Sequence, residues 1–402
     1  MKYVLATILL LNVGSVLAAD VQAQRDIAYT EPKNERQTLD VYAPTKGKGH
    51  PIVFWIHGGG WVSGDKTNMH EKPQAFVDKG FVFVSTNYRF VPKATINQIA
   101  SDMAKAIRWV HDHAKDYGGD PNTIFVMGHS AGAQLAALIC TDERYLKAEG
   151  LSFSIIKGCV PVDGDTYDVR MRIASVEERG KKNYKWKFGD EKNQKDLSSV
   201  THVAKDKKIP PFLILHVADS PATKPQSHRL FSVLQKAGVP SKAFPAEGKS
   251  HGTINSELGL PKDEPTKALF EFVTQTLKND LTDKEILQGT WEYVSATRDG
   301  KPYKTPIGIR ITFIGDNVTR KIGETTHKHK YEIDPNKNPK RVSLIAMKDG
   351  NEEVSTGIYS LKGDTLKWCF NLPGKPIPKT LASKEGDELT LSVLIRVKPE
   401  KE

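Results

Sequence analysis

The stretch Gly128-His129-Ser130-Ala131-Gly132 directly follows an apolar run, residues 123–127, and precedes a helix-prone run, residues 131–140. A strand that turns through G-x-S-x-G into a helix forms a nucleophile elbow, in which the serine oxygen projects clear of the backbone. The flanking glycines permit so tight a turn. Because a serine hydroxyl is a weak nucleophile without a neighbouring base, we predict that Ser130 is a nucleophile served by residues from elsewhere in the chain.

The pattern around this elbow alternates between strand and helix from about residue 40 to residue 278. Near-continuous apolar strands separated by helices are typical of a mostly parallel sheet with helices on both faces. The fold class predicted here is therefore α/β. The expected strands are 51–56, 81–85, 123–127, 153–160 and 211–215, and the expected helices are 96–117, 228–236 and 266–277. Residues 165–206 are highly charged and interrupt the alternation, so we expect an insertion over one edge of the sheet.

The character of the chain changes near residues 280–286, where we place a domain boundary. Short strands joined by Gly-Asp and Asp-Gly turns follow, which predicts a small antiparallel β-barrel. The predicted domains are residues 20–281 and residues 282–402. The expected strands of the second domain are 309–313, 317–321, 330–333, 342–346, 357–361, 365–370 and 388–397.

The first 19 residues have the pattern of an export signal. Lys2 supplies a positive start, residues 4–11 are apolar, and Ala18 and Ala19 are small residues suited to cleavage. We therefore expect a signal peptide and a mature protein that is periplasmic or extracellular. No later segment is long and apolar enough to predict a membrane span.

Size and composition are those of an ordinary two-domain globular protein, with 402 residues of which 38% are hydrophobic. The net charge of +10 is spread along the chain and accompanies no nucleic-acid-binding motif, so we expect no nucleic-acid partner. The three cysteines, Cys140, Cys159 and Cys369, are too few and too scattered for a disulfide framework. The sequence does not predict an oligomeric state.

Oxyanion donors are expected from the sequence His57-Gly58-Gly59-Gly60-Trp61, which follows the strand 51–56. Consecutive glycines leave backbone N–H groups unshielded, and two of these, from Gly59 and Gly60, together with that of Ala131, can stabilise a developing oxyanion. A phosphate-binding loop is the alternative interpretation, but neither a Lys-Ser/Thr pair nor G-x-G-x-x-G follows. We also expect His57, Trp61 and His129 to contact the substrate.

The base and the orienting acid complete the set that a serine hydrolase requires. His251 lies in the loop-like stretch Gly248-Lys249-Ser250-His251-Gly252 and is the predicted base. Asp219, just after the strand 211–215, is the predicted acid, while Asp163 and Asp165 remain alternatives. The order Ser, Asp, His along the chain is the order of the elbow type of hydrolase.

No metal ion or organic cofactor is predicted, because these protein groups complete the reaction. His111 and His113 belong to a predicted amphipathic helix. His327 and His329 alternate with lysines in the second domain, and two ligands among lysines make a poor cation site.

The chain resembles a known family in its glycine loop, its elbow and the intervening Asn87-Tyr88-Arg89. These match the α/β-hydrolase esterases in type and order, most closely the bifunctional feruloyl and acetyl-xylan esterase-like group, which is related to lipases and carboxylesterases. The resemblance spans roughly residues 25–280. It implies hydrolysis of carboxylic esters through an acyl-enzyme on Ser130.

Two departures from that family concern the acid and the pocket. The stretch His216-Val217-Ala218-Asp219 is one residue shorter than the family's usual spacing from His-Gly to the acid. The charged insertion, residues 165–206, differs from the family's usual covering segment, so the resemblance implies nothing about the shape of the pocket.

The second domain is similar to lipocalin-like modules, on the strength of Leu287-Gln288-Gly289-Thr290-Trp291 and Leu366-Lys367-Trp368-Cys369-Phe370. A ligand cavity and a filled interior are both compatible with this resemblance. For the whole chain we expect an exported serine esterase acting on small-molecule or polysaccharide esters, in particular carbohydrate or small aromatic-acid esters. An arylformamidase-like or peptidase-like hydrolase, or a non-catalytic binding protein on the same fold, are the alternatives.

Overall fold

The computed structural model describes residues 20–280, 282–303, 309–322, 325–348, 351–372 and 374–398. The predicted signal peptide, residues 1–19, lies outside the described residues. The chain forms two compact units that divide after Leu277, slightly before the boundary that the sequence predicts. Each unit is described by itself below.

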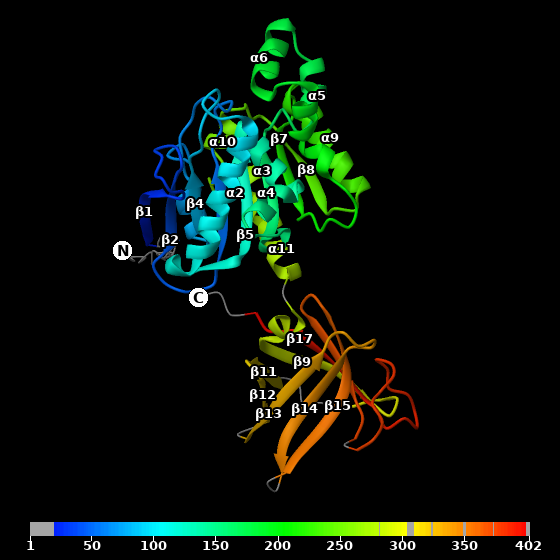
Figure 1. Ribbon diagram of the computed structural model, residues 1–402. Coiled ribbons are helices and arrows are strands. Elements are labelled where there is room, and N and C mark those ends of the chain that lie inside the picture. The colour runs from blue at the N-terminus through cyan, green and yellow to red at the C-terminus, as the bar shows by residue number, and fades with distance from the viewer. Residues whose placement is uncertain are drawn as a thin grey trace, which may run out of the picture. The chain divides into compact units, whose positions relative to one another are not determined.

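The first unit is built on an eight-stranded sheet in the order β1-β2-β4-β3-β5-β6-β7-β8 (Figure 1). Strands β3 to β8 pair in parallel, while β1 and β2 are antiparallel to their neighbours, which confirms the predicted mostly parallel sheet. The strands are β1 (Val21–Ala28), β2 (Thr38–Pro44), β3 (His50–Ile56), β4 (Val82–Thr86), β5 (Gly119–His129), β6 (Ile156–Val162), β7 (Phe212–Val217) and β8 (Ser241–Ala246).

Helices cover both faces of this sheet, because the central strands are apolar on both sides. Phe54 and Val126 face one core, which α2, α3, α4 and α9 complete, whereas Trp55 and Met127 face a second core with α1, α10 and α11. The helices on these faces are α1 (Lys72–Val77), α2 (Ile96–His113), α3 (Ala131–Thr141), α4 (Glu143–Ala148), α9 (Thr223–Lys236), α10 (Thr253–Ser256) and α11 (Glu264–Asp280). Two short 3₁₀ helices, Ala114–Tyr117 and Phe153–Ile155, precede β5 and β6.

The charged insertion forms four helices between β6 and β7, at the top of the first unit in Figure 1. They are α5 (Val169–Ala174), α6 (Glu178–Phe188), α7 (Glu191–Asp196) and α8 (Ser199–His202). Phe188 packs edge-on against Trp61, with ring centroids 4.9 Å apart. Since Trp61 follows the central strand β3, the insertion reaches the carboxyl ends of the middle strands. It therefore extends beyond the sheet edge over which the sequence predicts it.

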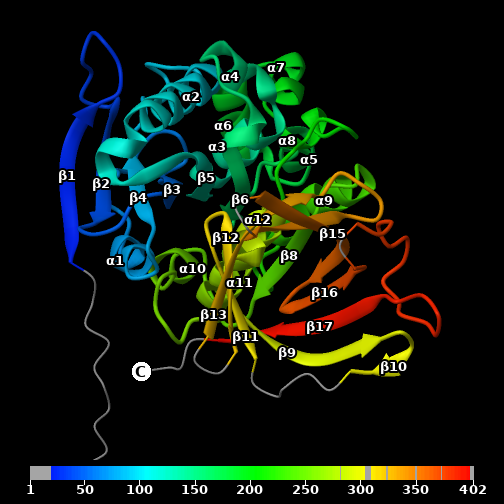
Figure 2. The ribbon, with the colours of Figure 1, turned by 90° about the horizontal axis from the view of Figure 1, so that it is seen from below.

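The second unit is an antiparallel barrel preceded by helix α12 (Asp283–Leu287). Eight strands close through pairing of β9 with β17, and β10 extends the sheet beside β9. Figure 2 shows β15, β16, β17 and β9 side by side in the barrel wall. The strands are β9 (Gly289–Arg298), β10 (Lys301–Pro302), β11 (Arg310–Ile314), β12 (Asn317–Ile322), β13 (Thr325–Asp334), β14 (Arg341–Lys348), β15 (Asn351–Lys362), β16 (Thr365–Phe370) and β17 (Thr390–Arg396). The predicted barrel is thus confirmed.

Candidate active site

Ser130 occupies the turn between β5 and α3, as the sequence predicts. Its φ of 56° and ψ of −118° lie in a region that residues other than glycine rarely adopt, and this strain is typical of a functional position. The turn requires glycine on both sides of Ser130. A Cβ atom on Gly128 would lie 2.4 Å from the carbonyl oxygen of Gly132, and one on Gly132 would lie 2.2 Å from that of Ile56.

A chain of two hydrogen bonds links Ser130 to a base and an acid. The Ser130 Oγ lies 3.0 Å from Nε2 of His251, and Nδ1 of His251 lies 2.6 Å from Oδ2 of Asp163. Ser130 comes from the end of β5, Asp163 directly follows β6, and His251 lies between β8 and α10. In this arrangement the imidazole can accept the serine proton while the carboxylate holds the ring in the required tautomer.

The acid partner corrects the sequence prediction. Asp219 is exposed and follows β7, whereas the His251 imidazole is bonded to Asp163, whose side chain is 1% exposed. The backbone N–H of Val217, at the end of β7, donates to the second Asp163 oxygen at 2.9 Å. The alternative Asp165 is engaged elsewhere, 3.0 Å from the Arg172 guanidinium and hydrogen-bonded to Tyr184.

Electrostatics favour an ionised Asp163 and strengthen His251 as a base. Burial raises the pKa of Asp163, but hydrogen bonds, the largest from His251, outweigh burial and hold that pKa below its usual value. The same hydrogen bond from Asp163 raises the pKa of His251, and this effect exceeds the opposing effect of burial. The pair is therefore arranged to stabilise an imidazolium when the serine loses its proton.

The predicted oxyanion loop lies beside the elbow. Gly59 and Gly60 have φ values of 121° and 60°, which glycine adopts readily, and the Gly59 carbonyl closes a turn by accepting from Val62 and Ser63. Within the described part of the chain, the N–H groups of Gly59, Gly60 and Ala131 donate to no protein acceptor. A Cβ atom on Gly58 would lie 3.1 Å from that of Ser130, so this loop and the nucleophile are neighbours.

The three residues expected to contact substrate are instead buried against protein. His57 stacks on the Tyr88 ring at 4.3 Å, and Trp61 donates from Nε1 to Gln134 at 3.2 Å. His129 Nε2 lies 2.9 Å from the backbone oxygen of His251. Only 1%, 3% and 8% of the surfaces of His57, Trp61 and His129 are exposed. These side chains hold the glycine loop and the His251 loop in place, and their contact with substrate stays a prediction.

Burial keeps the two supporting histidines neutral. It lowers the pKa of His57 to about 4, with the adjacent Arg36 charge contributing in the same direction. It also lowers the pKa of His129 to about 3, helped by the charge of His251. Neutral rings suit these positions, since each ring pairs one nitrogen with a backbone carbonyl oxygen.

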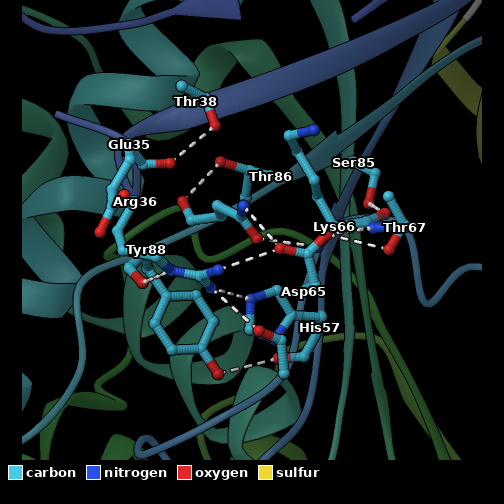
Figure 3. A network of polar contacts seen from close by, with 12 residues as sticks. Glu35, Arg36, Thr38, His57, Asp65, Lys66, Thr67, Ser85, Thr86 and Tyr88 are labelled. Carbon is cyan, nitrogen blue, oxygen red and sulfur yellow. Dashed lines mark hydrogen bonds and ion pairs between the residues drawn. The ribbon is translucent and has the colours of Figure 1, made fainter. Parts of the chain in front are cut away.

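Arg36 anchors the glycine loop from the connection between β1 and β2, and the sequence gives no signal for this role (Figure 3). Its guanidinium donates to Asp65 and to the Gly64 carbonyl, each at 3.0 Å, and approaches Nε2 of His57 at 3.3 Å. A further bond reaches the Tyr88 carbonyl at 3.3 Å. This one side chain thus links His57, at the start of the loop, to the turn that follows the loop.

Helix α6 brings a cation to the same loop. The Lys187 ammonium lies 5.5 Å from the centre of the Trp61 ring, and a methyl group on Gly60 would be 3.5 Å from it. Lys187 is half-buried, and burial lowers its pKa although the charge of Asp165 acts in the opposite direction. It forms no ion pair with any described residue. An unpaired ammonium therefore lies beside the predicted oxyanion glycines.

Two searches over the described residues gave negative results. No helix among them is long and apolar enough to cross a membrane. Nor do three or more His, Cys, Asp or Glu side chains gather there in a way that could hold a metal ion. The three cysteines are buried and unpaired.

Sequence comparison finds similar proteins that are named as esterases. An isoprenylcysteine alpha-carbonyl methylesterase of Arabidopsis thaliana is 27% identical, with 65% of this chain and 64% of that protein covered. Esterase LipQ of Mycobacterium tuberculosis is 28% identical over 62% of this chain and 61% of its own length. This chain spans about three fifths of the length of the curated relatives that it matches.

Solved structures share the fold of the first unit. Esterase B from Lactobacillus rhamnosis superposes with a TM-score of 0.54 at 21% identity, covering 65% of this chain and 86% of that chain. A truncated carbohydrate esterase from gut microbiota gives a TM-score of 0.52 at 22% identity, covering 65% and 98%. The BD-FAE family model matches residues 39–234, which include the glycine loop, Ser130 and Asp163. The first unit therefore contains a BD-FAE domain, that is, an α/β-hydrolase domain of the bifunctional feruloyl and acetyl-xylan esterase-like type.

Proposed function

We propose that the chain is a serine hydrolase that cleaves carboxylic esters through an acyl-enzyme on Ser130. The observation that carries the proposal is the hydrogen-bonded series from Ser130 through His251 to Asp163. The names of the relatives, which are esterases, support the reaction class.

The proposed reaction has two stages. The Ser130 oxygen attacks the ester carbonyl carbon while Nε2 of His251 takes its proton, and the resulting oxyanion accepts hydrogen bonds from Gly59, Gly60 and Ala131. The C–O bond to the alcohol then breaks, and His251 returns the proton to the leaving alkoxide. Water repeats the sequence on the acyl-serine and releases the acid. Each oxyanion donor of this kind is typically worth about 3–4 kcal/mol in the transition state.

The substrate that we propose is an ester of a carbohydrate or of a small aromatic acid. The resemblance of the first unit and the predicted export of the chain support this choice. The decisive assay compares 4-nitrophenyl acetate, butyrate and octanoate with methyl ferulate and acetylated xylan. Serine-dependent release of acid would establish the esterase and rank its substrates. No release from any ester would favour the arylformamidase-like, peptidase-like or binding alternatives.

Export itself is tested by the N-terminal sequence of the protein recovered outside the cytoplasm, which should begin after Ala18 or Ala19.

The pH profile should show an acidic limb set by His251. Only the neutral imidazole can accept the serine proton, and Asp163 raises the pKa of His251 from its usual 6.5. Activity should therefore fall as the pH drops through that raised value, so the midpoint of kcat/KM should lie above pH 6.5. A plot of log(kcat/KM) against pH checks this expectation, and a midpoint below 6.5 would contradict it.

Lys187 should favour esters that carry a negative charge near the scissile bond, because its ammonium forms no ion pair with a described residue and the nearby Asp165 is engaged with Arg172. Replacing Lys187 by Met should lower kcat/KM for monoethyl adipate about tenfold, the value of one charge-assisted hydrogen bond. The neutral analogue ethyl hexanoate should be cleaved as before.

Lys185→Met provides the matched control, since Lys185 is an exposed lysine on the same helix. Two results would exclude Lys187 as the residue that recognises the negative charge of the ester. One is an equal loss of kcat/KM for the two esters in Lys187→Met, and the other is an effect of Lys185→Met as large as that of Lys187→Met.

A further inference from the structure

A lysine without a carboxylate partner is buried close to the loop that carries His251. Lys72 is the first residue of α1, and 0% of its surface is exposed. No described carboxylate pairs with its amine, and burial lowers the pKa of Lys72 to about 7. Lysines are almost never fully buried unless they are paired. Since an uncompensated buried charge costs stability, packing alone does not explain a lysine at this position.

Two carbonyl oxygens and one aromatic ring surround the amine. Nζ of Lys72 donates to the backbone oxygen of Asn255 at 2.6 Å and to that of Met69 at 3.3 Å. It also lies 4.6 Å from the centre of the Trp55 ring, which is within the range of a cation–π contact. Met69 is close to Lys72 along the chain, whereas Asn255 is 183 residues away. The bond to Asn255 therefore joins two distant segments.

Asn255 belongs to the one-turn helix α10, which begins directly after the His251 loop. The N–H of Ile254 in this helix donates to the carbonyl oxygen of Ser250 at 3.0 Å. The helix and His251 thus belong to one hydrogen-bonded segment of backbone, and a shift of the helix is transmitted to His251. Figure 2 shows α1 and α10 as neighbours, which agrees with the bond from Lys72.

The backbone around His251 is held at two points. Nε2 of His129 lies 2.9 Å from the carbonyl oxygen of His251 itself, and Lys72 bonds to the helix that follows. Trp55, which the Lys72 amine also contacts, lies on β3 just before His57 and the glycine loop. One side chain therefore contacts both the strand that leads to the predicted oxyanion donors and the helix that follows the predicted base.

We propose that Lys72 is a positioning residue for His251, which fixes α10 so that the imidazole stays between Ser130 and Asp163. Methionine could fill a similar space without the cost of a buried amine, so the polar contacts of Lys72 explain its presence. The amine keeps N–H groups for both carbonyl oxygens whether or not it is protonated. The inference rests on the proposed serine hydrolase, but the position of the imidazole can be measured without turnover.

Lys72→Met tests the proposal, with Lys79→Met as the matched control. Lys79 is an exposed lysine just after the same helix and also lies over an aromatic ring, 5.9 Å from the centre of Phe270. Lys72→Met should lower kcat for 4-nitrophenyl butyrate at least about tenfold and leave KM within about twofold, because a small displacement of a catalytic group slows the chemical step more than it weakens binding. Lys79→Met should keep the kcat and KM of the parent chain.

The proton between His251 and Asp163 gives a second readout, which needs no substrate. The Nδ1–Oδ2 distance of 2.6 Å is that of a short, charge-assisted hydrogen bond, whose proton resonates at low field in proton NMR spectra. The absence of this resonance in His251→Gln identifies it. In Lys72→Met the resonance should move upfield or broaden, because the imidazole is no longer held against the carboxylate. Lys79→Met should leave it unchanged.

Thermal melts separate positioning from folding. The melting temperature of Lys72→Met should be unchanged or raised, since an apolar side chain replaces a buried amine. Four results would overturn the proposal: an unchanged kcat in Lys72→Met, a lowered kcat with an unchanged low-field resonance, an equal loss in Lys79→Met, or a Lys72→Met chain that no longer folds, which would make Lys72 a residue of stability alone. A parent chain that hydrolyses no ester would instead contradict the proposed function, and the low-field resonance of Lys72→Met would then decide the inference by itself.

Discussion

Replacing Ser130 by Ala should lower kcat for any ester that the enzyme hydrolyses by about 10⁶-fold, the loss typical of a removed triad nucleophile. The substitution removes the only atom that can form the acyl bond, and the imidazole of His251 then has nothing to deprotonate except water. Stability should hardly change. Ser130 Oγ forms its hydrogen bond with His251, and the strained φ of 56° is imposed by the surrounding turn rather than by the hydroxyl. Initial rates and thermal melts of the two proteins check both expectations.

Ser101→Ala is the control for this prediction. Ser101 is a half-buried serine on α2 that bonds only to the backbone oxygen of Asn97, so its removal should leave kcat unchanged. Turnover retained by Ser130→Ala above the level of a mock purification would exclude Ser130 as the nucleophile. A parent chain with no turnover at all would instead point to the binding alternative.

Local patterns predicted the parts of the site that depend on local backbone geometry. The elbow and the glycine loop each need several glycines within five residues, so each can be recognised as a short sequence motif. The elbow geometry confirms that reasoning, with a Cβ at Gly128 or Gly132 colliding with backbone oxygen atoms. The base, His251, could also be predicted from the sequence, because few other histidines lie in a glycine-rich loop after a strand.

The acid could not be chosen in this way, because the choice depends on which strand end faces His251. Asp163 and Asp219 both follow parallel strands, β6 and β7, which are neighbours in the sheet. The side chains therefore start from adjacent strand ends, and only the three-dimensional course of each turn decides which one reaches the imidazole. The φ of 52° at Asp163 belongs to that turn. A sharp turn of this kind has no signature that separates the two aspartates in a single sequence.

The sequence also could not predict that the side chains beside the motif glycines are buried. His57 and Trp61 flank the glycines, and their positions alone cannot show whether they face substrate or protein. Their partners come from distant segments: Arg36 precedes β2, and Gln134 lies on α3. In the second unit, turn signals predicted the strands, but only register reveals that Arg320 and His329 face inward. The alternation of histidine and lysine on β13 indicated exposed strand residues, which is correct for His327 and wrong for the half-buried His329.

Asp163→Asn should lower kcat by about 10⁴-fold, as expected when the group that fixes the histidine tautomer becomes an amide. The amide can donate to Nδ1 of His251, which would place the ring proton on Nε2 and leave no acceptor for the Ser130 hydroxyl. The hydrogen bond from Asp163 is also the largest cause of the raised pKa of His251. The acidic limb of the pH profile should therefore move to lower pH in this variant, a readout that a purely structural defect would not produce.

Asp219→Asn is the discriminating control, because it makes the same chemical change at the exposed end of the neighbouring strand. Its kcat should remain within about twofold of the parent value, since surface substitutions typically change interaction energies by no more than about 0.5 kcal/mol. The two variants thus separate two assignments that differ only in the course of adjacent turns. A large loss in Asp219→Asn with little loss in Asp163→Asn would mean that the loops rearrange when substrate binds, and that the carboxylate paired with His251 in the free protein is not the one that supports catalysis.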